Sequence, residues 1–201
     1  LKVATRKAAR EDVDVSFVEA DLRDFNLSQS FDFVFSLFDS LNYILTLEEL
    51  TEVFVNVYQI LKDNGIFIFY MNTIQRLMSI EPGTTIFNGD NYSCFWKDII
   101  DSKNVKWRVE LKIYMHNDKT RSYREVHEET SYPLADIKNA LYQAGFAHVD
   151  VYKAYTLDEG TDSDNRLYFA VFKEKPETTD KSFIKNATSK LKWKFRSFFK
   201  I

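Results

Sequence analysis

Two nearly continuous runs of apolar residues, 31–37 and 66–71, stand out in the first half of the chain. Strands covered on both faces of a sheet have this pattern, so we expect two buried, parallel strands. A shorter apolar segment at residues 15–18 predicts a third strand. A helix is expected between the two runs, because Thr46 and Glu49 have the spacing of a capping box. Strands separated by a helix in this way predict an α/β fold.

The pattern changes after residue 73, where apolar and polar residues begin to alternate. Residues 105–115 alternate throughout, and the segments 92–100 and 120–132 flank them across polar turns. Alternation is typical of strands with one solvated face. We therefore expect an inserted antiparallel sheet of three strands.

The last third of the chain returns to the first sheet. Pro133 opens a predicted helix that Gly145 closes, and strands are expected near 148–155 and 166–172. This organisation predicts four regions: a partial α/β core at 1–90, a β subdomain at 91–132, a return to the core at 133–175, and a linker with a tail at 176–201.

The composition is that of an ordinary soluble globular protein, with 45% hydrophobic and 28% charged residues among 201. Cys94 is the single cysteine, so a disulfide framework is excluded, and no cysteine or histidine spacing suits zinc. We expect a cytoplasmic setting and no metal. No apolar run approaches the ~20 residues that span a bilayer.

The net charge of -3 is the sum of an acidic body, residues 1–180, and a basic tail, residues 181–201. Residues 181–201 contain seven basic residues and no acid, and their apolar and basic side chains would fall on opposite faces of a helix. Such a helix is typical of a segment that binds an anionic membrane surface. Docking onto the chain's own acidic body, a protein partner, and a solubilising tail stay open as alternatives. Nucleic acid is disfavoured, because the acidic body offers little positive surface for phosphate.

Three segments together resemble a known family. Residues 18–22 read Val-Glu-Ala-Asp-Leu, residues 31–43 lead from Phe-Asp-Phe-Val to Phe-Asp-Ser-Leu-Asn-Tyr, and residues 61–69 place Leu-Lys-Asp-Asn-Gly before Phe-Ile-Phe. Their order and spacing are similar to class I S-adenosylmethionine-dependent methyltransferases, especially small-molecule enzymes that act on amino sugars and glycine-like amines. The resemblance implies a Rossmann-like methyltransferase sheet with the β subdomain inserted over the acceptor site.

The resemblance also implies how S-adenosylmethionine is bound. Asp21 would accept a hydrogen bond from the adenine amino group, and the backbone of Leu22 would contact the ring. Leu37 and Phe38 would border the sulfonium, at the carboxyl end of a strand, where ligands lie in open α/β sheets. Two plainer interpretations stay open: Asp21 as a turn residue, and Phe38 as core packing.

The acceptor is expected to be a small molecule, bound by Asp39, Asn42, Tyr43 and Asn72. Methyl transfer depends on positioning and on exclusion of water rather than on a protein nucleophile. His127 is the candidate general base, because the subdomain that carries it covers the acceptor in related enzymes. The alternative is a solvent-facing histidine beside two acids at 128 and 129.

One part of the family pattern is absent. The resemblance implies a first strand with a glycine-rich loop and a second strand that ends in an acid, but the five glycines all lie at residue 65 or later. We expect the two missing strands to belong between the 15–18 strand and the 31–37 strand. The chain is then predicted to be part of a polypeptide of roughly 250 residues.

Two functions follow from this sequence. The first is transfer of a methyl group from S-adenosylmethionine to a nitrogen or oxygen of a small molecule. The second is a non-catalytic, methyltransferase-like protein with a binding or regulatory role, which docks to a membrane or a partner through residues 181–201.

Overall fold

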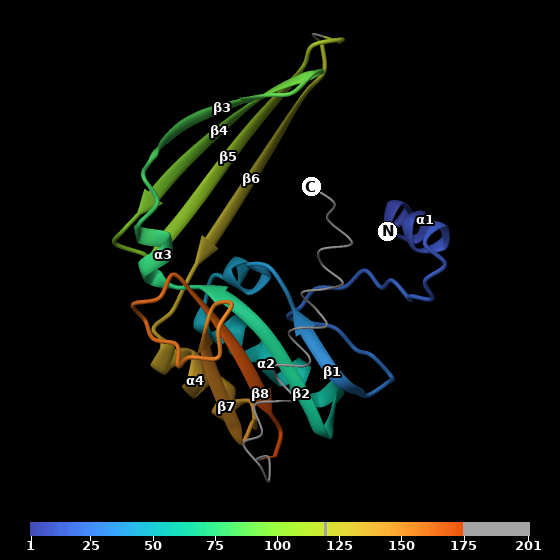
Figure 1. The fold of residues 1–201 in the computed structure, drawn as a ribbon, viewed down its shortest axis with the longest axis vertical. Helices are drawn as coiled ribbons and strands as arrows, with labels where there is room; N and C mark the ends of the chain where they lie inside the picture. Colours follow the sequence, from blue (N-terminus) through green and yellow to red (C-terminus); the bar gives the residue numbers. More distant parts are fainter. Residues whose placement is uncertain (119, 175–201) are drawn as a thin grey trace.

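Two four-stranded sheets, joined at one end, make up most of the computed structural model (Figure 1). It describes residues 1–118 and 120–174. The predicted linker and basic tail at 176–201 lie outside the described residues. Within the described part of the chain, no helix has both the length and the apolar character needed to cross a membrane.

The first sheet, called the core sheet, has the strand order β1-β2-β8-β7. Its strands are β1 (Phe31–Ser36), β2 (Leu61–Asn72), β7 (His148–Lys153) and β8 (Arg166–Phe172). The pair β1 and β2 is parallel, as expected, while β8 runs antiparallel to both of its neighbours. The predicted α/β architecture and the return of the chain to the first sheet are confirmed.

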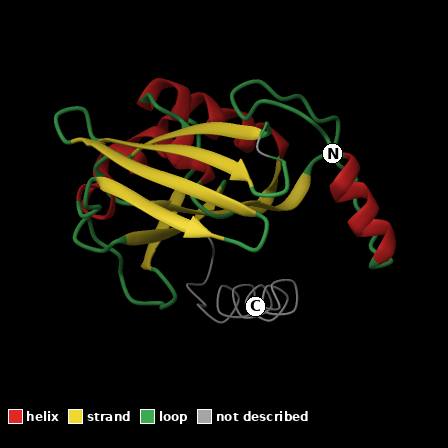
Figure 2. Ribbon diagram, turned by 90° about the horizontal axis from the view of Figure 1, so that it is seen from above, coloured by secondary structure: helices red, strands yellow, loops and turns green. Residues whose placement is uncertain are grey.

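Helices α2 (Leu47–Ile60) and α4 (Leu134–Gln143) cover one face of the core sheet (Figure 2). Thr46 caps α2 by accepting a hydrogen bond from the Glu49 backbone N–H at 3.2 Å, which confirms half of the predicted capping box. Gly145 follows α4 with φ of 106°, a left-handed conformation that favours glycine. Phenylalanine rings fill the space between helices and sheet, with Phe69 stacked on Phe169 at 4.5 Å between centroids.

The second sheet contains four strands in sequential antiparallel order, not the three that were predicted. They are β3 (Gly83–Asn88), β4 (Tyr92–Asp101), β5 (Lys106–Met115) and β6 (Ser122–Thr130), preceded by the short helix α3 (Ile74–Met78). All six residues of β3 are exposed, so no buried face marks it in the sequence. The second sheet therefore begins at residue 83 instead of 91.

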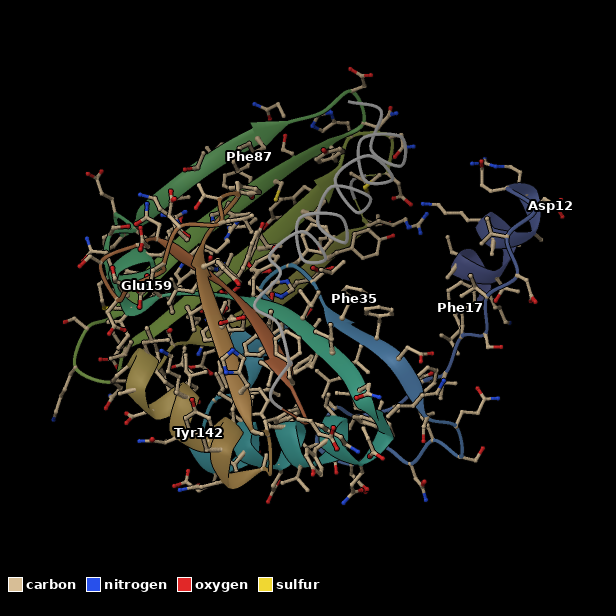
Figure 3. All side chains as sticks on the ribbon, turned by 60° about the horizontal axis from the view of Figure 1, so that its bottom comes forward. Asp12, Phe17, Phe35, Phe87, Tyr142 and Glu159 are labelled. Carbon is tan, nitrogen blue, oxygen red and sulfur yellow. The ribbon has the colours of Figure 1, made fainter. Side chains whose placement is uncertain are left out.

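The predicted strand at residues 15–18 is wrong. This segment belongs to the arm, residues 11–30, which connects α1 (Lys2–Arg10) to β1 and contains no strand. Val15 and Val18 are 48% and 64% exposed, and Phe17 lies well apart from Phe35 on β1 (Figure 3). A strand needs a neighbour to pair with. Among the described residues, the edge of β1 opposite β2 pairs with no strand.

Candidate functional site at the junction of the two sheets

The carboxyl ends of two parallel strands meet at the junction of the two sheets. Leu37, Phe38 and Asp39 follow β1 directly, and Asn72 is the last residue of β2. The chain after β6 reaches the same place, where the Ser131 hydroxyl donates to the Asn72 carbonyl at 2.8 Å. Ligands bind at such strand ends in open α/β sheets. The predicted location of 37–39 at a strand end is confirmed, while their ligand contacts stay predictions.

Phe38 occupies the turn between β1 and the 3-10 helix η1 (Ser40–Tyr43) with an uncommon backbone conformation. Its φ of 59° lies in the left-handed region, which costs a residue with a side chain about 1–2 kcal/mol. The side chain is 52% exposed, so Phe38 is not part of the hydrophobic core. Left-handed residues of this kind concentrate at functional sites.

Asn42 on η1 is fully buried, and backbone groups satisfy its amide. Its Nδ2 donates to the Asn72 carbonyl at 3.0 Å and to the Thr130 carbonyl at 2.7 Å, while its Oδ1 accepts from the Asn72 N–H at 2.9 Å. We predicted that Asn42 contacts the acceptor. In the structure its amide instead ties η1 to the ends of β2 and β6, because three backbone groups there need partners.

The Asn72 side chain lies among charged groups of both signs. Its Nδ2 is 3.4 Å from Asp39 Oδ2 and 3.5 Å from Glu129 Oε2, and its Oδ1 accepts a 3.2 Å hydrogen bond from Arg166 Nε. Asn72 and Glu129 are 3% and 4% exposed. Three strands and the turn after β1 thus bring two carboxyl groups, an amide and a guanidinium to one largely buried place.

The environment of Glu129 favours its neutral form. Burial raises the pKa of the Glu129 carboxyl to about 7, and the nearby Asp39 carboxylate adds to the rise. Asn72, Arg166 and Arg76 lower the pKa in opposition, without cancelling the effect. A carboxyl with this pKa can exchange a proton near neutral pH.

His127 has partners on both sides of its ring. Its Nδ1 lies 3.1 Å from the Tyr43 hydroxyl oxygen, and its Nε2 lies 3.2 Å from Glu125 Oε2. The two rings meet edge to face at 5.9 Å. His127 is therefore not simply a solvent-facing histidine beside two acids. Burial, and then the charges of Glu129 and Asp39, raise the pKa of Tyr43, which links this chain of contacts to the two carboxyl groups.

The face on which each β6 side chain lies follows from strand alternation. Residues two apart share a face, so Glu125, His127 and Glu129 lie on one side and Glu128 on the other. Glu128 forms a 3.6 Å ion pair with Lys106 on the neighbouring strand. His127 and Glu129 contact Tyr43 and Asn72 at the junction, and Glu125 contacts His127, whereas Glu128 does not take part in these contacts.

Arg166, the first residue of β8, is held in place by tyrosines. Its guanidinium lies 4.9 Å from the centroid of the Tyr70 ring, and Nη1 donates to the Tyr155 hydroxyl at 3.1 Å. Burial raises the pKa of Tyr70 to about 12, so this phenol stays neutral. Arg166 therefore reaches Asn72 from a fixed position.

The predicted adenine residues, Asp21 and Leu22, lie on the arm instead of at the end of a strand. Both oxygens of Asp21 accept hydrogen bonds from the Arg23 guanidinium, at 3.0 and 2.7 Å, and Arg23 continues to Glu49 at 2.7 Å. The hydrogen bonds from Arg23 lower the pKa of Asp21 to about 2, so it is ionised. Leu22 is 40% exposed. The role of both residues in cofactor binding stays a prediction.

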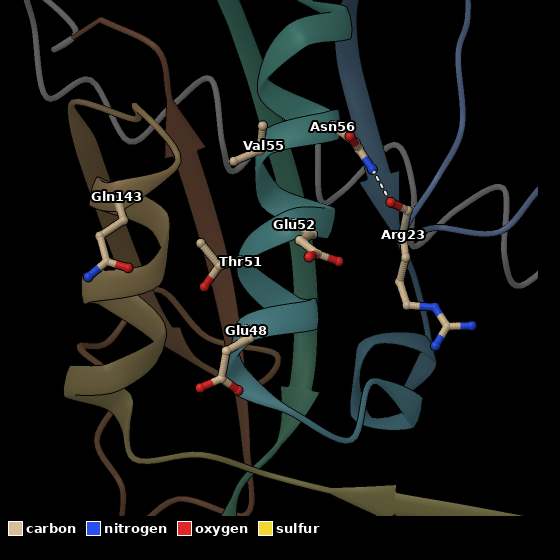
Figure 4. Close-up of a pocket in the computed structure, with 7 residues that line it drawn as sticks. All are labelled: Arg23, Glu48, Thr51, Glu52, Val55, Asn56 and Gln143. Carbon is tan, nitrogen blue, oxygen red and sulfur yellow. Dashed lines mark hydrogen bonds between the residues drawn. The ribbon is translucent and has the colours of Figure 1, made fainter.

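Arg23 also borders an open depression on the outer side of α2 (Figure 4). The dashed contact in that view is the 2.8 Å hydrogen bond from Asn56 Nδ2 to the Arg23 carbonyl, which fixes the arm to α2. None of the residues predicted for cofactor or acceptor lines this depression. Its lining is Arg23, Glu48, Thr51, Glu52, Val55, Asn56 and Gln143.

Sequence reasoning assigned no site role to Arg166 and left Glu129 as a neighbour of His127. The sequence could have indicated a site role for Glu129, because side chains two apart on a strand lie on the same face and Glu129 is two residues after His127. No residue pattern near Arg166 indicates that its side chain reaches the site. Its approach to Asn72 depends on the pairing of β8 with β2, two strands separated by the whole second sheet.

Comparison with known proteins agrees with this geometry. A family described as a methyltransferase domain matches residues 1–65, from α1 to the first half of β2. The protein named "Putative methyltransferase GWCH70_2453", from Geobacillus sp. (strain WCH70), is 25% identical over 176 residues. These residues cover 86% of this chain and 71% of that protein.

Solved structures share the fold. An S-adenosylmethionine-dependent methyltransferase from Clostridium acetobutylicum ATCC 824 superimposes with a TM-score of 0.75 at 21% identity, over 85% of this chain and 70% of that one. The sugar N-methyltransferase KedS8 from Streptoalloteichus sp. ATCC 53650 gives a TM-score of 0.61 at 22% identity, over 85% and 68%. The core sheet is thus Rossmann-like. In sequence and in fold the chain is therefore similar to methyltransferases, among them S-adenosylmethionine-dependent enzymes.

Proposed function

We propose that the protein methylates a nitrogen or oxygen of a small molecule bound at the junction of the two sheets. The observation that carries this proposal is the convergence of Asp39, Asn72 and Glu129 at the carboxyl ends of β1 and β2. A few convergent polar groups in a largely apolar setting are what a small-molecule site uses to orient its ligand. The likeness in fold to a sugar N-methyltransferase supports a small-molecule acceptor.

The residues at the strand ends suit the cofactor as well. S-adenosylmethionine supplies a methyl group on a positively charged sulfur, and an exposed aromatic ring such as Phe38 stabilises a nearby cation. In this proposal Leu37 and Phe38 border the sulfonium, and Asp21 and Leu22 hold the adenine. Asp21 then shares its oxygens between Arg23 and the adenine amino group.

The acceptor is proposed to lie against Asp39, Tyr43 and Asn72. His127 is the proposed general base and acts through the Tyr43 hydroxyl, which lies 3.1 Å from its ring. We assign Asn42 a positioning role, because three backbone groups already satisfy its amide. Positioning matters for this reaction, since the acceptor atom must approach the methyl group in line with the bond that breaks.

A non-catalytic binding role is the second candidate. The pairing of Asp21 with Arg23 favours it, because both carboxylate oxygens already have donors. Calorimetric titration of S-adenosylhomocysteine separates the two. The measurement should use the 201-residue chain and a version extended upstream through its natural reading frame. Binding by either form supports the enzyme, whereas no binding by both forms supports the non-catalytic role.

A further inference from the structure

Two carboxyl groups, those of Asp39 and Glu129, lie close together at the junction. Asp39 Oδ2 and Glu129 Oε2 both lie within 3.5 Å of Asn72 Nδ2, so the two oxygens are at most about 7 Å apart. Among the described residues, neither carboxylate forms an ion pair. A buried carboxylate without a counter-ion is unfavourable unless a cation arrives with a ligand.

Two arginines, Arg166 and Arg76, act on Glu129 through their charge, and neither forms an ion pair with it among the described residues. Arg166 directs Nε to the carbonyl end of the Asn72 amide and Nη1 to the Tyr155 hydroxyl, and its guanidinium carbon lies over the Tyr70 ring. The donor end of that amide faces the two carboxylates. The charge distribution at the junction therefore suits a ligand with a positive group directed at Glu129 and Asp39.

Glu129 is also better placed than His127 to receive a proton from such a ligand. Both ring nitrogens of His127 have partners, Tyr43 and Glu125, and its side chain is 35% exposed. Glu129 is 4% exposed, and among the described residues the hydrogen bond of its carboxyl group is a long one of 3.5 Å, to Asn72. A water-excluded base with a weakly held oxygen can meet the acceptor atom directly.

We propose that the acceptor is an amine that arrives protonated, and that Glu129 binds this ammonium group and takes its proton. This inference rests on the proposed methyltransferase function and narrows it to nitrogen. It gives the role of base to Glu129 in place of His127, and leaves His127 a positioning role through its contact with Tyr43. One N–H bond breaks and the proton passes to Glu129, which leaves a neutral amine with a free electron pair. That pair forms the new N–C bond while the methyl–sulfur bond breaks, giving a methylammonium and S-adenosylhomocysteine. Glu129 releases its proton to water when the product leaves.

The groups that face Glu129 set the pH at which it works. Burial and Asp39 raise its pKa to about 7, so near neutral pH it is available both as a base and as a proton carrier. The charged and titratable groups around it come from five elements or turns: Asp39, Tyr43, Arg76, His127 and Arg166. Because the ionised form of Glu129 binds the ammonium group, kcat/KM should rise with pH, and the rise in the pH–rate profile should be centred near pH 7.

The test compares Glu129→Gln with Glu128→Gln in the intact protein. Glu129→Gln keeps the shape of the side chain and removes its charge, while Glu128 lies on the opposite face of β6 and pairs with Lys106, which makes it a matched control. The probe is the protein-free small-molecule fraction of the source cells with methyl-labelled S-adenosylmethionine. Mass spectrometry identifies the labelled product, and urea unfolding confirms that each variant is folded.

The expected result is an N-methylated product, with the rate for Glu129→Gln about 100-fold lower and the rise near pH 7 lost. Glu128→Gln should stay within about twofold of the wild-type rate. Glu129→Asp should recover part of the activity. An O-methylated product, or an unchanged rate for Glu129→Gln, overturns the role of Glu129 and leaves the proposed function standing. Absence of any labelled product from the wild type overturns the proposed function itself.

Discussion

The side chain of Asn42 pairs with the backbone of Asn72 as one strand residue pairs with another. Asn42 Oδ1 accepts from the Asn72 N–H at 2.9 Å, and Asn42 Nδ2 donates to the Asn72 carbonyl at 3.0 Å. A further bond to the Thr130 carbonyl at 2.7 Å fixes the same amide to the end of β6. Because Tyr43 follows Asn42 on η1, this amide also sets where Tyr43 stands relative to His127.

Replacement of Asn42 by alanine should lower the free energy of unfolding by about 2–4 kcal/mol. It leaves the Asn72 N–H and the Thr130 carbonyl buried without this partner, and each such group costs about 1–3 kcal/mol. Urea denaturation measures the change. Asn104→Ala is the control, because Asn104 bonds Asp101 in an exposed turn. A loss for Asn42→Ala no larger than for the control would contradict this account.

The contact between Tyr43 and His127 predicts coupled effects on catalysis. Tyr43→Phe removes the hydroxyl 3.1 Å from the imidazole but keeps the ring, and we expect kcat/KM to fall about 10-fold to 100-fold. The double variant with His127→Asn should lose little more than His127→Asn alone, because the two groups act as one unit. His116→Asn, which disturbs a contact with Ser93, should have little effect. Fully additive losses would show that Tyr43 and His127 act separately.

The adenine role of Asp21 predicts a specific loss of cofactor affinity. Asp21→Asn should weaken binding of S-adenosylhomocysteine about 10-fold, the effect of one hydrogen bond to a charged group. Asp24→Asn, three residues further along the arm, is the control. Calorimetric titration of the upstream-extended form measures both. Equal affinities for wild type and Asp21→Asn would leave Asp21 as a turn residue that pairs with Arg23.

Glu129 predicts a pH-dependent stability with a definite sign. Its pKa is raised from 4.5 to about 7 in the folded state, so the folded protein holds this proton in a range where the unfolded chain has lost it. As pH rises from 4.5 to 7, this group therefore removes up to about 3 kcal/mol of stability. Glu129→Gln does not titrate and should gain stability relative to wild type by that amount at pH 8. Urea unfolding at pH 4.5 and pH 8 tests this, and a pH-independent difference would contradict it.

The basic segment 181–201 predicts binding to anionic membranes. Liposomes that contain phosphatidylserine should carry the protein upward in a flotation assay, and 0.5 M salt should weaken this binding, because screening shortens the range of the attraction. A chain that ends at residue 180 is the matched control. Equal flotation of both chains, or none, would favour the alternatives of self-docking or a protein partner.

Residue patterns predicted the elements that are buried and failed for those that are not. The strands β1 and β2 lie in apolar runs, and α2 begins at its predicted cap. Residues 15–18 look like a strand by composition, yet their side chains are largely exposed, because in the described structure nothing pairs with them. Conversely, β3 has no buried face and exists through its hydrogen bonds to β4. Pairing is a long-range property that local patterns do not record.

In the candidate site too, some residues could be placed from local sequence, while others depend on contacts between distant parts of the chain. The strand ends at 37–39 and Asn72 could be placed from the sequence, since ligands of α/β sheets lie at carboxyl ends. The sequence could not show that the Asn42 amide is used by the backbone, because its partners lie 30 and 88 residues away. The approach of Arg166 to Asn72 likewise depends on contacts made across the sheet.

The chain order of the core sheet has a consequence for synthesis on the ribosome. Asn72 on β2 pairs with Arg166 on β8, and the whole second sheet is made between them. A nascent chain therefore carries β2 with one open edge until residues 166–172 emerge. Open edges invite pairing with other chains, and contacts so distant in sequence form slowly. Synthesis that stops before Arg166 would release an aggregation-prone product that also lacks the guanidinium at the candidate site.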